Sequence, residues 1–292
     1  MTAINVFDRP VLFARRQRAT SDITKADFLH KAVFEDMLER LDDIKRGFEV
    51  ALDLHTRPED LSATLAAHPK IHTLRKARFY QTGEEDVTLL EGETLRADEA
   101  SLDLIFSHLH MHTINDLPGV LAQCRRALKP DGLLLASLFG GTTLSELRQA
   151  LLQAELDVTG GASPRVAPFT SVQDIGMLLQ RAGFALPLVD AHTYTALYPD
   201  IFHLMADLRQ MGETNAITER LKRPTRREVF LRAGQYYAEK YAHDDGQIPA
   251  SFEVITLTAW APALSQPKPL APGSAKARLA EALDVDEVKL KR

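Results

Sequence analysis

The segment from Leu102 to Gly141 constrains the fold more than any other part of the chain. LDLIFS at 102–107 and GLLLASLF at 132–139 are short apolar runs, the pattern of strands that are buried on both faces of a sheet. Between them, residues 117–128 place apolar side chains at helical spacing, with Pro118 in the first turn. A strand, a helix and a second strand in this order predict two parallel strands joined by a right-handed crossover.

The rest of the chain continues this alternation. The sequence predicts a helix at 24–41, a strand at 48–54, a helix from Pro58, strands at 71–77 and 87–92, helices at 143–158 and 172–183, and strands at 185–198 and 252–262. Such an alternation, ending in two neighbouring strands, predicts an α/β fold with a Rossmann-like, seven-stranded, doubly wound sheet. We expect three parts: a basic arm and cover helix at 1–46, the α/β domain at 47–261 with a helical insertion at about 199–250, and a Pro-rich linker with a charged tail at 262–292.

Composition and charge exclude several classes of function. The 292 residues are 45% apolar and carry a net charge of −5, which is typical of a globular protein and argues against nucleic-acid binding. Cys124 is the only cysteine, which excludes an intramolecular disulfide and fits a reducing compartment. Because no apolar run approaches the roughly 20 residues that span a bilayer, we expect a cytoplasmic protein with at most peripheral membrane contact. Asp8 and Asp22 argue against a transit segment, so the basic run at 15–18 is expected to be a solvated arm.

Several motifs together resemble a known family. The end of the first strand, Asp53-Leu54, followed later by DLIFS and LKPDG, resembles the class I methyltransferases that depend on S-adenosylmethionine (SAM). NVFDR, INDLPG, GGTTLSELR, GGASPRVAPF, LMADLRQMGETNAI and FEVITLTAWAP resemble a narrower group. That group is the mitochondrial complex I (NADH dehydrogenase) assembly factor 5 family with its bacterial relatives, which is similar to the malonyl-carrier-protein methyltransferase of biotin synthesis. The resemblance implies a Rossmann-like methyltransferase domain at 47–261.

The resemblance implies SAM as the cofactor, at positions that depart from the superfamily pattern. The residues that match cofactor-binding positions are Asp53, Leu54, His55 and Thr56 after the first strand, Glu91, Gly92 and Glu93 after the third, and Ser107 and His108 after the fourth. The glycines of the usual turn are absent, and 74–76 (Leu-Arg-Lys) replaces the usual ribose-binding acid. A lost charged acceptor costs about 1.5 to 3 kcal/mol, so we expect weakened SAM binding or a modified binding mode.

Candidates for contact with a substrate or partner follow the later strands. Ligands bind beyond the carboxyl ends of parallel strands, so His112, Gly141 and Thr142 are candidates. Arg165, in a loop, could clamp an anion or form a salt bridge, and Tyr194 could face the crevice or lie on an edge strand.

A metal site is the weaker interpretation of the histidine motif. His108, His110 and His112 alternate, and in an extended segment they would point one way and could hold iron or zinc. No fixed carboxylate partner is visible, so we expect a polar wall of the cofactor site and no metal. The sequence identifies no catalytic base.

The sequence is compatible with three functions. By resemblance, the chain acts on a protein partner, a respiratory NADH dehydrogenase subunit, by methyl transfer or arginine hydroxylation, in the mitochondrial matrix if the source is eukaryotic. Alternatively, it methylates a small or carrier-bound carboxyl group. A third interpretation is an inactive methyltransferase-fold scaffold with a degenerate SAM site.

Overall fold

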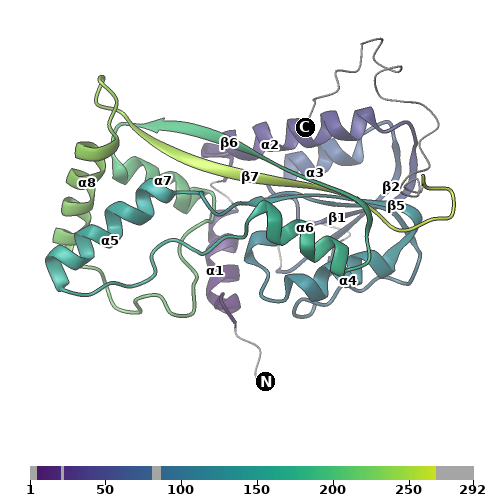
Figure 1. The fold of residues 1–292 in the computed structure, drawn as a ribbon, viewed down its shortest axis with the longest axis horizontal. Helices are drawn as coiled ribbons and strands as arrows, with labels where there is room; N and C mark the ends of the chain where they lie inside the picture. The colour runs from purple at the N-terminus through teal and green to yellow at the C-terminus, as the bar shows by residue number, and fades with distance from the viewer. Residues whose placement is uncertain (1–4, 21–22, 81–86, 268–292) are drawn as a thin grey trace, which may run out of the picture. The chain divides into compact units, whose positions relative to one another are not determined.

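The computed structural model describes residues 5–20, 23–80 and 87–267. Residues up to Pro262 form one compact unit, and the residues from Ala263 belong to a second one. The first unit is built on a seven-stranded sheet in the order β3-β2-β1-β4-β5-β7-β6 (Figure 1). The strands are β1 (Phe48–Leu54), β2 (Ile71–Arg78), β3 (Val87–Leu89), β4 (Leu102–Ser107), β5 (Leu128–Phe139), β6 (Ala185–Tyr198) and β7 (Ile248–Trp260). The Rossmann-like, seven-stranded sheet predicted from the sequence is confirmed.

β7 is antiparallel to both of its neighbours, β5 and β6, whereas the pairs among β1 to β5 are parallel. Four strands differ from their predicted bounds. β3 ends at Leu89 and not at 92, and β7 spans Ile248–Trp260 and not 252–262. β5 begins at Leu128, because Leu128 pairs with Leu102 and the register shifts before Leu104. β2 runs one residue beyond the expected end, to Arg78, with consequences for the site.

Helices cover both faces of the sheet, and each face has its own core. On one face lie α2 (Phe28–Asp43) and α3 (Glu59–Ala66), and on the other α4 (Leu117–Ala127) and α6 (Val172–Arg181) (Figure 1). Side chains cap two of these helices, since Asp116 accepts from the amide of Gly119 and Ser171 from that of Asp174. Within the described residues no helix is long and apolar enough to cross a membrane.

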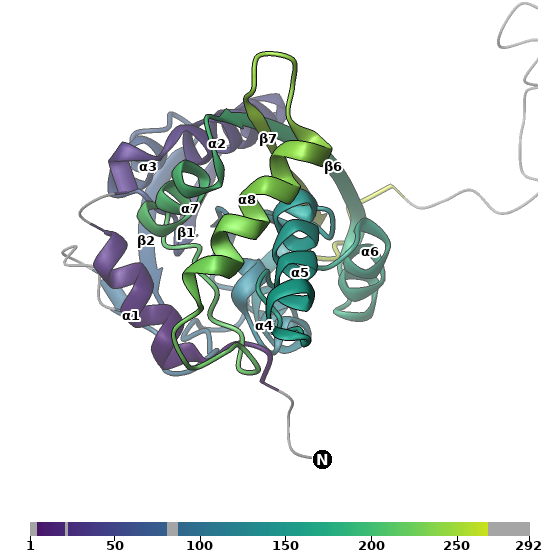
Figure 2. The ribbon, with the colours of Figure 1, turned by 90° about the vertical axis from the view of Figure 1, so that its left-hand side faces the viewer.

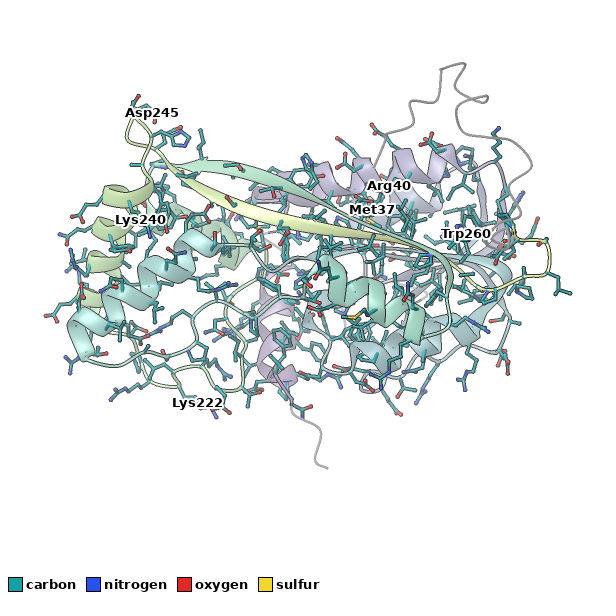
Figure 3. The ribbon with its side chains drawn as sticks, in the orientation of Figure 1. Met37, Arg40, Lys222, Lys240, Asp245 and Trp260 are labelled. Atoms are coloured by element: carbon teal, nitrogen blue, oxygen red, sulfur yellow. The ribbon has the colours of Figure 1, made fainter. Side chains whose placement is uncertain are left out.

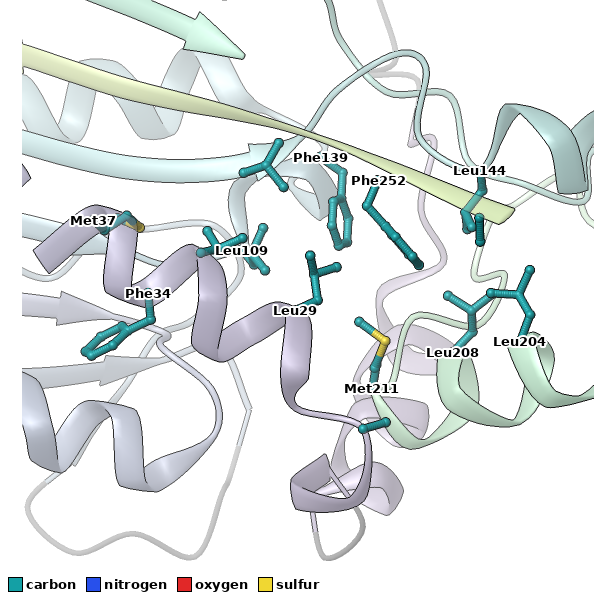
Figure 4. Close-up of a cluster of buried hydrophobic side chains, with 14 of the residues drawn as sticks. Leu29, Phe34, Met37, Leu109, Phe139, Leu144, Leu204, Leu208, Met211 and Phe252 are labelled. Carbon is teal, nitrogen blue, oxygen red and sulfur yellow. The ribbon is translucent and has the colours of Figure 1, made fainter. Parts of the chain in front are cut away.

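The predicted insertion between β6 and β7 forms α7 (Ile201–Gln210) and α8 (Arg227–Tyr241). α8 packs along α5 (Ser145–Thr159), and the two lie side by side in Figures 1 and 2. Lys240 of α8 and Asp245 in the loop before β7 mark the outer end of this part (Figure 3). Leu208 and Met211 of the insertion share one core with Leu29 of α2 (Figure 4). The insertion is therefore joined to the rest of the unit by apolar packing.

The solvated N-terminal arm predicted from the basic run is wrong. Residues Arg9–Ala19 form a helix, α1, which Asp8 caps by accepting a hydrogen bond from the Val11 amide. Leu12, Ala19 and Arg16 are buried, and Arg16 is 0% exposed. The run of basic residues does not indicate the burial of Arg16, because a buried guanidinium needs partners that lie far away in the sequence. The helix predicted at 24–41 is present as a short 3₁₀ turn at Ile23–Lys25 followed by α2.

Candidate functional site

Asp53, at the end of β1, is fully buried, and both of its carboxylate oxygens accept hydrogen bonds. Its Oδ1 accepts from the amide of Thr56 at 2.9 Å, and its Oδ2 accepts from Arg78 Nη2 at 2.9 Å and from the Ser62 hydroxyl. Arg78 ends β2 and is also 0% exposed. Because β2 runs further than predicted, the basic residue at the strand end is Arg78, not a residue of 74–76. A cation, turned inward onto Asp53, thus stands at the end of the strand where the superfamily has an acid.

Aromatic and imidazole rings fill the space beside the first turn. His55 has φ +67, a backbone conformation that glycine adopts at little cost, so the glycine geometry is kept while a side chain is added. The His55 ring centroid lies 4.2 Å from that of His110 and 4.5 Å from that of Tyr80. His110 also stacks on Phe79 at 4.6 Å. Burial strongly lowers the pKa of both His55 and His110, which keeps the two rings neutral at neutral pH.

The turn after β3 is held by the chain itself. The two carboxylate oxygens of Glu93 accept from the amides of Asn115 and Asp116 at 2.8 and 2.7 Å. Arg9 of α1 donates to the Gly92 carbonyl. Glu91 lies largely in solvent and pairs with Arg96. Of these residues, the exposed Glu91 is the one whose carboxylate remains open to water.

The wall beyond β4 likewise bonds internally. The Ser107 hydroxyl donates to the Leu54 carbonyl at 3.0 Å, and Thr56 is buried. His108 packs against His30 and Phe34 of α2, and burial lowers the pKa of His108 to about 3.

These contacts decide whether a nucleoside cofactor fits. The predicted cofactor residues Asp53, His55, Glu93 and Ser107 lie at or after the ends of β1, β3 and β4, but their polar groups are already bonded to other parts of the chain. Asp53 is bonded to Arg78 and Ser62, Glu93 to two backbone amides, and Ser107 to a backbone carbonyl. The rings of His55 and Tyr80 occupy the place beside the turn that a glycine would leave open. In this arrangement the residues present do not fit SAM.

A second set of buried polar groups forms one network around Glu213, which follows α7. Glu213 Oε1 accepts from Arg16 Nη2 at 2.7 Å and from Arg57 Nη2 at 2.9 Å, and Oε2 lies 3.2 Å from His112 Nε2. Arg16 also reaches His110 Nδ1 at 3.0 Å and Thr113 Oγ1 at 3.1 Å. We call Arg16, Arg57, His112 and Glu213 the carboxylate network.

The groups of the carboxylate network shift one another's pKa values. Burial acts to raise the pKa of the Glu213 carboxyl, but Arg16, His112 and Arg57 outweigh it and hold that pKa well below its usual range. Burial lowers the pKa of His112, against the opposing pull of Glu213, so the imidazole is neutral at neutral pH. Gly212 has φ +73 and lies against Arg16 and Arg57, where a Cβ would come within 3.1 Å of each. The chain therefore requires glycine at this close approach.

Sequence reasoning missed Arg16, Arg57 and Glu213 as site residues. Glu213 lies in LMADLRQMGETNAI, which served only as a family signature, and Arg57 was considered only as part of a turn that His55, Thr56 and Arg57 could rebuild for a modified mode of cofactor binding. The one available signal was the Gly212-Glu213 pair in a helical insertion.

The side chains of the three alternate histidines do not point to one common place, as a shared metal site would require. The segment is not extended, since Leu109 has φ 44 and Met111–Thr113 is a 3₁₀ turn. His108 therefore faces α2, His110 faces His55, and His112 faces Phe139 and Glu213. Among the residues that the structure describes, no three histidine, cysteine or acidic side chains are grouped so as to hold a metal ion.

A cavity of about 820 Å³ opens beside the carboxylate network. His112, Thr113 and Glu213 line it, so the network forms part of its floor. Its apolar walls include Phe139, Leu147, Phe169, Leu208, Phe230 and Phe252. The cavity does not touch Asp53, His55, Glu91, Glu93 or Ser107, the residues expected to hold a cofactor.

The other predicted substrate residues fall into two groups. Arg165 lines the cavity, but its guanidinium is paired with Glu155 and donates to Thr225 Oγ1 at 2.7 Å, as the salt-bridge alternative predicted. Gly141 and Thr142 do not line it, although the next residue, Thr143, does. Tyr194 is not at the site, because its hydroxyl donates to Asp36 of α2.

Comparisons with known proteins agree on a methyltransferase fold. A family model described as "Methyltransferase domain" matches residues 59–136. The mitochondrial arginine-hydroxylase NDUFAF5 of Danio rerio is 36% identical over 289 residues, which cover 95% of this chain and 89% of that protein. The human protein of the same name is 36% identical over 95% of this chain and 83% of its own.

A malonyl-[acyl-carrier protein] O-methyltransferase of Laribacter hongkongensis is 31% identical, covering 90% of this chain and 93% of that protein. Among solved structures, the YcgJ protein from Bacillus subtilis matches with a TM-score of 0.53 at 13% identity, over 78% of this chain and 99% of that one. A methyltransferase candidate from Bacillus halodurans matches with a TM-score of 0.52 at 15% identity, over 79% and 99% of the two chains.

Proposed function

The chain belongs, as its motifs predicted, to the methyltransferase-fold family that includes the mitochondrial arginine-hydroxylase NDUFAF5 and malonyl-[acyl-carrier protein] O-methyltransferases, and from this premise we propose that it acts on an arginine side chain of a protein partner. The partner that the family resemblance implies is a subunit of respiratory NADH dehydrogenase. The compartment we propose is the one that houses this partner: the mitochondrial matrix in a eukaryote or the cytoplasm in a bacterium, at most peripheral to the membrane.

The observation that carries the proposal is Glu213, a buried carboxylate that already holds guanidinium groups at the floor of the cavity. Its Oε1 is shared by Arg16 and Arg57, whereas Oε2 contacts His112. Charge-assisted bonds between guanidinium and carboxylate are among the strongest hydrogen bonds in proteins. An arginine of a partner that enters the cavity can lay its aliphatic stem against Phe139 and Phe252 and reach Glu213 with its guanidinium.

These residues are assigned binding, orientation and proton handling. Glu213 positions the guanidinium, and the neutral His112 imidazole, 3.2 Å from that carboxylate, can accept a proton at a ring nitrogen. Hydroxylation converts a C–H bond of the arginine into C–OH, so the proposal requires a co-reactant from outside the chain: dioxygen with a two-electron donor, one oxygen atom entering the product and the other leaving as water.

Methyl transfer to a carrier-bound carboxyl group is the second candidate. The identity to malonyl-[acyl-carrier protein] O-methyltransferases favours it, and the fold itself is that of enzymes that use SAM. Against it stands the position of Arg78 on Asp53 and of the His55 ring beside Tyr80. The same contacts favour the third candidate, an assembly scaffold without chemistry.

Mass spectrometry of the partner subunit separates the three candidates. In cells that carry the parent chain, we expect one arginine of the subunit to gain one oxygen atom. Glu213→Gln and, as a second variant, His112→Asn should abolish this gain, while Glu239→Gln, at an exposed carboxylate of α8 outside the cavity lining, serves as the matched control. The abundance of each variant is measured in parallel, so that loss of protein is not mistaken for loss of chemistry. A methyl group in place of oxygen would support methyl transfer, and an unmodified subunit in a normally assembled complex would support the scaffold.

A further inference from the structure

The lining of the cavity is strongly cationic, although the whole chain has a net charge of −5. The arginines that line it are Arg15, Arg18, Arg165, Arg209, Arg220 and Arg223, and of the lining residues that the structure describes only Glu213 carries a carboxylate. Glu213 is engaged by Arg16 and Arg57, so it does not offset this charge. The electrostatic potential of the entrance is therefore positive.

Some of these arginines are neutralised inside the fold and others are not. Arg165 pairs with Glu155, and Arg220 pairs with Asp8 at 3.0 Å. Arg18, Arg209 and Arg223 are exposed, and among the described residues none of the three contacts a carboxylate. We call these three the rim arginines. Their charge has no counter-charge among the described residues.

The cations at this entrance lie close enough to affect one another. Burial lowers the pKa of Arg15, and the neighbouring guanidiniums of Arg220 and Arg18 lower it further. In the stretch that leads into α8, the exposed cations Lys222, Arg226 and Arg227 outnumber the exposed carboxylates Glu219 and Glu228. Lys222 lies on the loop between α7 and α8, where it faces away from the sheet (Figure 3). A cationic group that approaches this entrance alone is repelled.

That repulsion limits which arginine can enter. If the proposed function is correct, the guanidinium of a partner must pass the rim arginines to reach Glu213. Carboxylates next to the arriving arginine remove the repulsion and pair with the rim. In an extended segment successive residues are about 3.3 Å apart, so acidic residues within two positions of the arginine remain near the entrance.

From this we infer that the cavity selects an acidic peptide segment: an arginine flanked by aspartate or glutamate, with Arg18, Arg209 and Arg223 pairing with the flanking carboxylates. The inference rests on the proposed function and adds the chemistry of the partner around the target side chain.

The test uses the full chain and four fluorescent synthetic peptides in an anisotropy assay. Two peptides carry a central arginine, one with aspartate and glutamate at the four flanking positions and one with asparagine and glutamine there. The other two replace the arginine with citrulline, its neutral analogue. Exposed ion pairs contribute modestly each, so we expect the acidic flanks to lower the Kd about tenfold at low salt, with a smaller effect at high salt.

Substitutions at the exposed rim separate this effect from folding. Arg18→Gln, Arg209→Gln and Arg223→Gln combined should remove the preference for acidic flanks. The matched control combines Lys45→Gln, Arg75→Gln and Arg181→Gln, three exposed cations outside the cavity lining, and should keep the preference.

The outcomes distinguish this inference from the proposed function. Equal affinity for acidic and neutral flanks, or a preference that survives the triple rim variant, overturns the inference. Citrulline that binds as well as arginine overturns recognition of the guanidinium, and with it the proposed function, whatever the flanks do. Binding to phosphatidylserine vesicles that depends on the rim arginines, without binding of any peptide, assigns the entrance to a membrane surface and also overturns the inference.

Discussion

Arg78 donates a hydrogen bond to Asp53 over 2.9 Å, and neither side chain reaches solvent. The pair joins the ends of β1 and β2, the two strands that frame the cofactor crevice of this fold. A cation in this place both neutralises the buried carboxylate and takes the position of a ribose-binding acid. The contact therefore bears both on the stability of the fold and on whether the crevice can hold a nucleoside.

Replacing Arg78 tests whether the stability of the fold depends on its contact with Asp53. Arg78→Met leaves Asp53 buried without its cation, and breaking such a pair costs about 3 to 5 kcal/mol of the free energy of unfolding. Urea denaturation measures the loss. Arg75→Met, on the exposed face of the same strand, should change stability by no more than about 0.5 kcal/mol. An Arg78→Met protein as stable as its parent would show that Asp53 does not depend on this cation.

Titration with SAM tests whether the crevice binds a nucleoside cofactor. Because the rings of His55, Tyr80 and His110 are packed together at 4.2 to 4.5 Å, the parent chain should give no saturable heat with SAM or with its demethylated product. The melting temperature should also stay unchanged. Saturable binding with a rise in melting temperature would mean that the rings move aside, and it would restore methyl transfer as the leading candidate.

The fold could be predicted from the sequence because its signals are local. The apolar runs at 102–107 and 132–139 each report their own burial, and the alternation of strands and helices fixes the sheet type. The degenerate turn was visible for the same reason, since His55 stands where a glycine is expected.

The carboxylate network could not be predicted, because its partners are distant in sequence. Arg16 and Glu213 are 197 residues apart, and nothing near either residue indicates the other. A charge run such as 15–18 usually faces water, and only tertiary packing of α1 shows that Arg16 is the exception. Arg78 was missed for a smaller reason: the end of β2 was placed one residue too early.

Cys124 should not react with thiol reagents in the native protein. It lies on the buried face of α4, and burial raises the pKa of its thiol to about 12. Because the thiolate is the reactive form, a thiol reagent such as Ellman's reagent should give no signal until the chain is unfolded in guanidinium chloride. Cys124→Ser provides the blank. Rapid native labelling would show that α4 opens from the sheet.

The order of stabilities within the carboxylate network is a further prediction. Arg16→Met leaves Glu213 paired with Arg57, whereas Glu213→Gln leaves two buried guanidiniums without a counter-charge. We expect Glu213→Gln to lower the free energy of unfolding more than Arg16→Met, which should cost about 3 kcal/mol. Gln17→Ala, on the exposed side of α1, is the control.

Hydrogen exchange of α1 reports on the same variants. Arg16 anchors the helix through His110, Thr113 and Glu213, so Arg16→Met should speed amide exchange in α1 more than in α2. Equal exchange in parent and variant would mean that the other contacts of α1, among them the packing of Leu12 and Ala19, hold the helix without Arg16.

Buried histidines predict a steep loss of stability in mild acid. Burial lowers the pKa of His30, His55 and His110 well below the usual value, and that of His108 to about 3. The unfolded chain binds protons at these groups near pH 6.5 while the native state does not, so their stability contribution is present above pH 6.5 and is lost as the pH falls. For His108, whose native pKa is about 3, the loss from pH 7 to 5.5 is about 1 kcal/mol, and the other three histidines change stability in the same direction.

His30 offers the sharpest test of this dependence. Both of its ring nitrogens lack a hydrogen-bond partner among the described residues, so His30→Phe removes a titrating group without breaking a bond. Urea denaturation at several pH values should show a slope below pH 6 that is shallower by up to about 1.4 kcal/mol per pH unit. Phe34→Leu, in the same aromatic cluster, changes packing but no proton binding, and should lower stability equally at every pH. A His30→Phe protein with the slope of its parent would mean that His30 is protonated in the folded state, and that the burial seen here does not control its charge.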